Sequence, residues 1–119
     1  MHLVEWNDRS IEDRRRIICV AASKLEAASD ADFRVVHYLM DNFEIINLFV
    51  RELLKVQDCG KHQYSAQRIY EFLAHQNTLL QRKLNFIENA RTATVIARLL
   101  TEVFRTDLIG FFDNEGVKA

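Results

Sequence analysis

Four histidines and two cysteines are the side chains in this sequence best suited to metal or nucleophilic chemistry. Cys59 and His62 have the C-x-x-H spacing that supplies half of a zinc site, but no second pair of such residues exists. Glu71 and His75 are four positions apart, whereas di-iron bundles use Glu-x-x-His motifs on two helices. Nucleophilic catalysis needs a histidine companion and a strained turn, and neither is recognisable. We therefore predict no metal site, no cofactor and no enzyme activity.

Arginines recur at seven-residue spacing towards the carboxyl end, at Arg91, Arg98 and Arg105. On a helix this spacing drifts by only about 20° per step, so the three side chains form one row. Such a row could hold the carboxylates of an acidic partner helix, or phosphate groups, because each guanidinium presents a planar fork of donors. The alternative is a solvated face in which Arg98 pairs with Glu102.

Large apolar residues lie outside the strongest helical stripes near both ends of the chain, with Trp6 at one end. They either pack onto the ends of the helices or are exposed together as a docking or self-association patch. We predict a partner-binding surface on the last helix and the aromatic residues after it, in which Phe112→Ala weakens binding without unfolding the domain. Its members are Arg91, Arg98, Arg105, Leu108, Phe111 and Phe112.

Helix start signals recur along the chain and would position these side chains. Ser10, Ser29 and Ser65 stand where a hydroxyl can cap a helix, and another helix begins after Asn89. Apolar residues follow each of them at three- and four-residue steps, which is typical of one helical face. In the first helix this stripe continues to Ala28.

Helix stop signals are fewer. Gly60 suits the left-handed end of a helix, and Asp41-Asn42 predicts a break between two helices, because these residues prefer caps to helix interiors. A weaker break is expected at residues 76–78, after which Leu80, Leu84 and Ile87 continue the helical pattern. The count is five helices, or six to seven with both breaks.

Two segments match when one is shifted by 34 positions: Tyr38-Leu39 falls on Phe72-Leu73, and Leu53 falls on Ile87. A truncated third copy begins at Phe111. Over about residues 33–117 this hydrophobic spacing weakly resembles armadillo and HEAT-type helical repeats. The resemblance implies stacked helical hairpins and a protein-interaction scaffold whose partner lies on a concave helical face. The alternative is an ordinary helical bundle.

Composition limits the remaining classes. The 119 residues are 49% hydrophobic, enough for one core, and contain no proline and only three glycines, too few for the turns of a β-sandwich or barrel. Charged residues nearly balance at a net charge of -1, which disfavours a dedicated nucleic-acid binder. No apolar run approaches the roughly 18 residues of a membrane span.

We therefore expect one all-α domain over residues 1–119, a bundle of five to seven helices or a short repeat array, and a chain that is a fragment of something longer. The predicted function is protein–protein interaction as an adaptor, scaffold or regulatory module, with another protein or a second copy as partner. The alternative is a small helical nucleic-acid-binding regulator that uses its arginine rows for phosphate contacts. The expected location is cytoplasmic or nuclear, with no membrane partner.

Overall fold

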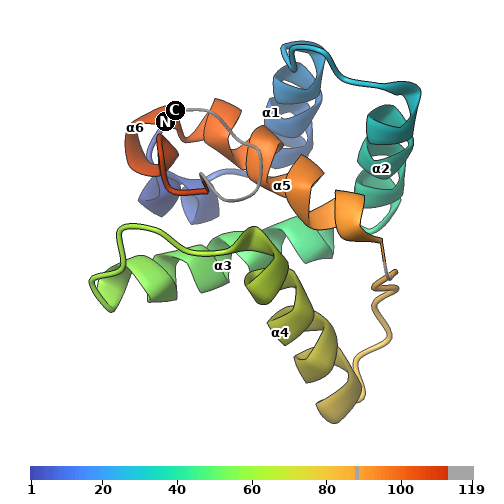
Figure 1. Cartoon of the computed structure of the whole chain (residues 1–119), viewed down its shortest axis with the longest axis vertical. Helices are drawn as coiled ribbons and strands as arrows, with labels where there is room; N and C mark the ends of the chain where they lie inside the picture. The colour runs from blue at the N-terminus through green and yellow to red at the C-terminus, as the bar shows by residue number, and fades with distance from the viewer. Residues whose placement is uncertain (88, 113–119) are drawn as a thin grey trace.

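The computed structural model describes residues 1–87 and 89–112. In these residues the chain forms seven helices and no strand, which confirms the all-α prediction (Figure 1). One is a short 3₁₀ helix, η1. In chain order the helices are η1 (Leu3–Asp8), α1 (Ile11–Ser23), α2 (Asp30–Asp41), α3 (Glu44–Asp58), α4 (Ala66–Leu79), α5 (Ala90–Val103) and α6 (Arg105–Leu108).

Side-chain caps fix the start of four helices at the predicted residues. The hydroxyl oxygens of Ser10, Ser29 and Ser65 each accept a hydrogen bond from the backbone N–H three residues later. The Asn89 side chain accepts one from the N–H of Arg91 at 2.9 Å. Each such cap satisfies an otherwise unpaired N–H and stabilises its helix by about 1 kcal/mol.

Both predicted helix ends around α3 are also confirmed. The Asn42 side-chain amide donates to the carbonyl oxygen of Tyr38 at 2.9 Å and closes the end of α2 before α3 begins. Gly60 takes a φ of 82°, and the Lys61 N–H reaches back to the Val56 carbonyl at 3.4 Å. Glycine adopts this left-handed conformation without steric cost.

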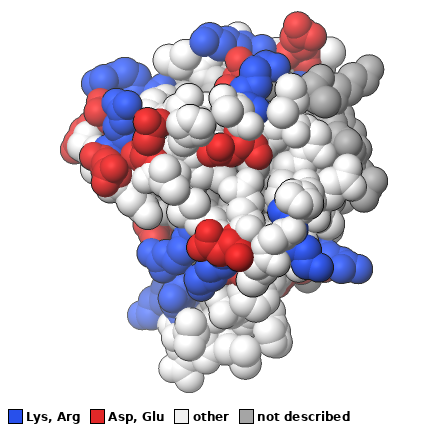
Figure 2. All heavy atoms as spheres, turned by 90° about the vertical axis from the view of Figure 1, so that its left-hand side faces the viewer, with Lys and Arg blue, Asp and Glu red and all other residues white. Residues whose placement is uncertain are grey.

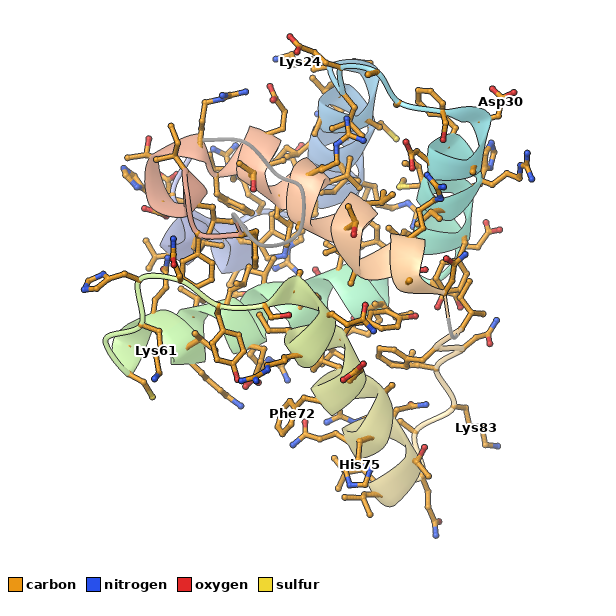
Figure 3. The ribbon with its side chains drawn as sticks, viewed as in Figure 1. Lys24, Asp30, Lys61, Phe72, His75 and Lys83 are labelled. Carbon is orange, nitrogen blue, oxygen red and sulfur yellow. The ribbon has the colours of Figure 1, made fainter. Side chains whose placement is uncertain are left out.

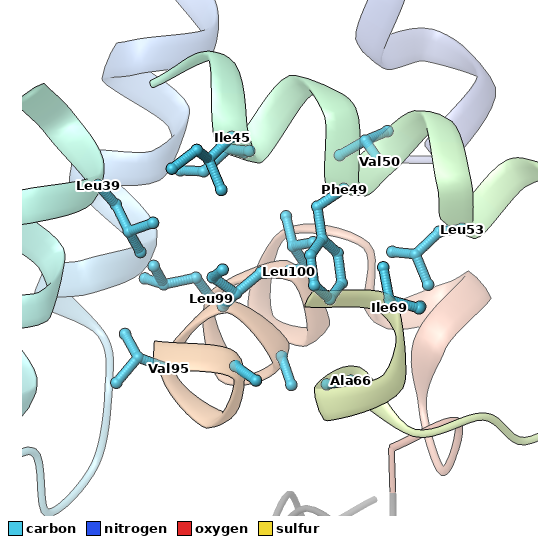
Figure 4. Close-up of a cluster of buried hydrophobic side chains, with 14 of the residues drawn as sticks. Leu39, Ile45, Phe49, Val50, Leu53, Ala66, Ile69, Val95, Leu99 and Leu100 are labelled. Atoms are coloured by element: carbon cyan, nitrogen blue, oxygen red, sulfur yellow. The ribbon is translucent and has the colours of Figure 1, made fainter. Parts of the chain in front are cut away.

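Helix α5 lies at the centre of the fold, packed against α1, α2, α4 and α6. Most of its side chains are buried, including two threonines, so it has little free surface. Figure 4 shows side chains of α2, α3 and α4 meeting those of α5 in one hydrophobic cluster. The labelled members of the cluster are Leu39, Ile45, Phe49, Val50, Leu53, Ala66, Ile69, Val95, Leu99 and Leu100.

The prediction that the helix after Ser65 continues through Ile87 is wrong. Helix α4 runs through residues 76–78 without the weaker break and ends at Leu79. Gln81 then adopts a φ of 52°, and residues 82–87 form an irregular segment. Three N–H groups, from Leu80 to Arg82, close the helix end by bonding back to carbonyls of the last turn.

This segment also bears on the 34-residue repeat. The first copy contains the long helix α3, whereas the corresponding part of the second copy, residues 78–87, is helical only at residues 78 and 79. The two copies therefore do not form equivalent hairpins. Most of the proposed third copy, from Asp113 to Val117, lies outside the described residues.

Candidate functional site

The first two arginines of the predicted row, Arg91 and Arg98, form intramolecular ion pairs with Asp32 of α2. Arg91 Nη1 lies 2.8 Å from Asp32 Oδ1, and Arg98 Nη1 lies 3.5 Å from Asp32 Oδ2. Asp32 is buried and also accepts the backbone N–H of Ser29 at 2.9 Å, which completes a capping box. One carboxylate thus caps α2 and ties it to α5.

The electrostatics of Asp32 follow from these contacts. Burial raises the pKa of this carboxyl, but the hydrogen bonds from Ser29 and Arg91 and the charge of Arg91 outweigh burial. The net pKa therefore lies below the ordinary value of 3.8. At neutral pH Asp32 is a carboxylate that contacts one nitrogen of each guanidinium group, and a partner would have to share these groups with it.

The other members of the row are held locally. Arg98 also donates to the Glu26 carbonyl oxygen in the loop before α2. Arg105 pairs with Glu102 at 2.6 Å on the surface, so Glu102 is not the partner of Arg98 that we expected. Contact of these arginines with another molecule stays a prediction.

The apolar residues predicted to bind a partner are packed into the core. Leu108, Phe111 and Phe112 are each at most 3% exposed. The Phe112 ring lies 6.5 Å from the ring of Phe49 and 5.0 Å from that of Phe111, between ring centroids. Of the alternatives left open by the sequence, packing is the one observed at these three residues, because the hydrophobic gain of burial is large for aromatic side chains.

Trp6, the aromatic residue at the other end, is fully buried as well. Its ring packs edge-on against Phe104 at 5.7 Å, and its indole N–H donates to Asn47 at 2.9 Å. Ile109, which follows Leu108, is 55% exposed and faces solvent. Within the described residues, Trp6, Phe111 and Phe112 are therefore part of the core and do not form an aromatic surface.

The residues considered for metal or acid–base chemistry are scattered. Cys59 and His62 are exposed in the loop between α3 and α4, and Glu71 and His75 are exposed on α4. In the described part of the chain, no three histidine, cysteine or acidic side chains gather in a way that could hold a metal ion. Nor does any described helix have the length and apolar character needed to cross a membrane.

A surface that sequence reasoning missed lies on the outer side of α4. Phe72 is 42% exposed, Leu79 is 66% exposed and Leu80, which follows the helix, is 57% exposed. Arg68 and His75 are also exposed and share the stripe, since residues 68, 72, 75 and 79 follow one another by four, three and four positions. Figure 3 shows Phe72 and His75 projecting from the same side of α4.

We call the exposed residues Arg68, Phe72, His75, Leu79 and Leu80 the α4 face. Figure 1 shows α4 extending away from the other helices towards the bottom of the view. On the side of the molecule shown in Figure 2, this lower end is largely uncharged. The sequence held a signal for this face, the seven-residue spacing of Phe72 and Leu79. This spacing was hard to recognise because each of the two stands next to another apolar residue, Leu73 or Leu80.

The other side of α4 carries a polar hollow of about 660 Å³ between the helix and residues 84–87, 89 and 90. Asn77 holds this segment by two bonds, accepting from Leu84 N at 3.3 Å and donating to Leu84 O at 2.9 Å. The Tyr70 hydroxyl donates to the Ile87 carbonyl at 2.8 Å, and burial raises its pKa. The α4 projection is thus a helix braced by an extended return segment.

Comparison of the chain with protein-family models, curated proteins and solved structures found no match. Evidence about the function of this chain therefore comes from its own surfaces, of which the α4 face places three large apolar side chains in solvent.

Proposed function

We propose that this chain is a protein-binding domain whose contact surface is the α4 face. The observation that carries the proposal is the exposure of Phe72, Leu79 and Leu80 together at the projecting end of α4. Single exposed apolar residues are ordinary on protein surfaces, but two on one stripe of a helix, with a third directly after its end, form the kind of patch that partners cover. A partner helix or groove would meet this stripe at steps of three and four residues.

The free energies of side-chain burial and of association indicate how large the contact must be. Complete burial of a side chain such as leucine or phenylalanine contributes roughly 1.5–3 kcal/mol, and these three are already partly buried. Association costs at least about 4 kcal/mol of lost freedom. The apolar side chains alone are insufficient for tight binding, so the polar members of the face, Arg68 and His75, belong to the contact as its rim.

The nucleic-acid alternative is less well supported than it was by the sequence. That alternative assigned phosphate contacts to the arginine row, and two of those arginines already share an ion pair with the carboxylate of Asp32. A gel shift at two salt concentrations tests it, because phosphate contacts weaken steeply with salt.

The test compares two equally exposed apolar positions. Leu79→Asp places a charge in the α4 face, and Val4→Asp, at a residue 69% exposed on η1, is the matched control. Tagged wild type and both variants are purified from the native cells, and co-purifying proteins and native mass are measured. We expect one partner, or a second copy, to be retained by wild type and Val4→Asp and lost from Leu79→Asp. Identical partners and mass for all three proteins would refute the proposal.

A further inference from the structure

A groove that is separate from the polar hollow and from the α4 face lies along α1, beside the end of α5. Its volume is about 360 Å³. The floor is apolar: Ala21 is buried, Ile17 and Val103 pack partly buried against the core, and Val20 stays 47% exposed. The remaining residues that line it are Met1, Arg9, Arg16, Lys24 and Glu102.

The rim of this groove is cationic. Arg9, Arg16 and Lys24 line it, and in residues 1–87 and 89–112 neither Arg9 nor Lys24 forms an ion pair. Arg16 pairs with Asp13 at 2.9 Å, but its side chain is 72% exposed and keeps most of its donors in solvent. The one carboxylate on the rim, Glu102, is paired with Arg105. An apolar floor under a net positive rim favours an amphipathic, acidic occupant.

The distance between Arg16 and Lys24 distinguishes the kinds of acidic molecule that could fill the groove. Arg16 lies on α1 and Lys24 directly follows its last residue, so the two are eight residues apart, which is about 12 Å or two helical turns. A fatty acid would fill the floor, but its single carboxylate could not reach both cations. A polyphosphate chain would reach both and leave Ile17 and Val20 facing water.

We propose that this groove binds an acidic amphipathic helix of another protein. Two turns of such a helix place apolar side chains at steps of three, four and seven residues onto Ile17, Val20 and Val103. Carboxylates on the flanks of that stripe contact Arg16 and Lys24. This site is separate from the α4 face, so the domain would bridge two partners.

The test uses a synthetic helical peptide of about fourteen residues, roughly four turns, with leucines on one stripe and glutamates on its flanks. The ¹⁵N-labelled protein is titrated with it, and with a control in which lysine replaces every glutamate. We expect the acidic peptide to shift the amide signals of Ile17, Val20 and Val103 and the basic peptide to leave them unchanged. Absence of binding, or equal binding of both peptides, overturns the proposal.

Variants locate the site. The double variant Arg16→Glu, Lys24→Glu should raise the Kd of the acidic peptide about tenfold, because two rim contacts become repulsive. The double variant Arg51→Glu, Lys61→Glu, at exposed cations of α3 and of the loop after it, is the charge-matched control and should leave the Kd unchanged. Circular dichroism verifies that each variant is folded.

Two further arms identify the source of the acidic group. Dodecanoate or anionic phospholipid vesicles, tested in place of the peptide, should not produce the same shifts; if they bind and the peptide does not, the helix assignment is wrong. Leu79→Asp should bind the peptide like wild type. That result separates this groove from the α4 face, so either proposal can fail alone.

Discussion

At the scale of single residues, Asp32 shows what sequence could and could not predict. The sequence predicted the Ser29 cap of α2, and Asp32 completes this cap as a capping box three residues later, within the same helix start. Its ion pairs with Arg91 and Arg98, 59 and 66 residues away, depend on how α2 packs against α5. The arginine row was visible in the sequence, but its partner was not.

The account predicts a stability cost for removing this carboxylate. Asp32→Asn should lower the free energy of unfolding by about 1–3 kcal/mol, since it weakens the cap and leaves two guanidinium groups without their charge partner. Urea unfolding at pH 7 measures the cost. Asp30→Asn, an exposed acid in the same first turn, is the control and should change stability by less than about 0.5 kcal/mol.

The same group predicts a pH dependence. The pKa of Asp32 is lower in the folded protein than its ordinary value of 3.8, so its contribution to stability is present above pH 3.8 and is lost as the pH falls towards the folded pKa. Wild type should lose more stability than Asp32→Asn between pH 5 and pH 3, measured by urea unfolding. The variant should still lose some stability, because Asp107 also has a lowered pKa in the folded protein. Burial raises the pKa of Asp107, but the hydrogen bonds from the backbone N–H of Leu3 and from the His2 side chain outweigh burial. Equal losses in both proteins would contradict this assignment.

At the scale of helices, starts were predicted better than ends. Gly60 marked the end of α3, whereas α1 and α4 end before Ala27 and Gln81, which take φ values of 53° and 52° without glycine. A non-glycine residue rarely adopts this conformation, so nothing local announced either end. For this reason we extended the first helix to Ala28, although α1 ends at Ser23, and carried the fourth past Leu79.

The return segment after α4 depends on side chains for its backbone partners. Asn77→Ala removes both hydrogen bonds to Leu84 and should cost about 1–2 kcal/mol of unfolding free energy. Amide exchange at Leu84 should accelerate relative to that in α5. Asn85→Ala is the control, since its side chain lines the hollow without holding the segment. Unchanged protection at Leu84 would show that the segment is held by other contacts.

At the scale of the whole molecule, the two ends of the described chain close one core around α5. Trp6 packs against Phe104, and Phe112 packs against Phe49. The sequence supplied these aromatics and left open whether they were core or surface. That choice is made by long-range packing, which also turned the apolar pairs at 72–73 and 79–80 so that Phe72, Leu79 and Leu80 face solvent.

Phe112→Ala consequently has a different expected outcome from the one its sequence position suggested. Because Phe112 is 1% exposed, its truncation leaves a cavity and should cost about 3–5 kcal/mol of unfolding free energy. Chemical denaturation measures this. Phe33→Ala, at a ring 43% exposed, should cost under about 1 kcal/mol. A stable Phe112→Ala protein with impaired binding would instead restore the role first expected for this residue.

The central claim is that the α4 face meets another protein, and photo-cross-linking tests it most directly. Benzoylphenylalanine is incorporated in place of Leu79, and separately in place of Val4, in the native cells. After irradiation the account predicts a discrete adduct with one protein, or with a second copy of the chain, from position 79 and none from position 4. No adduct from position 79, or the same adducts from both positions, would contradict it.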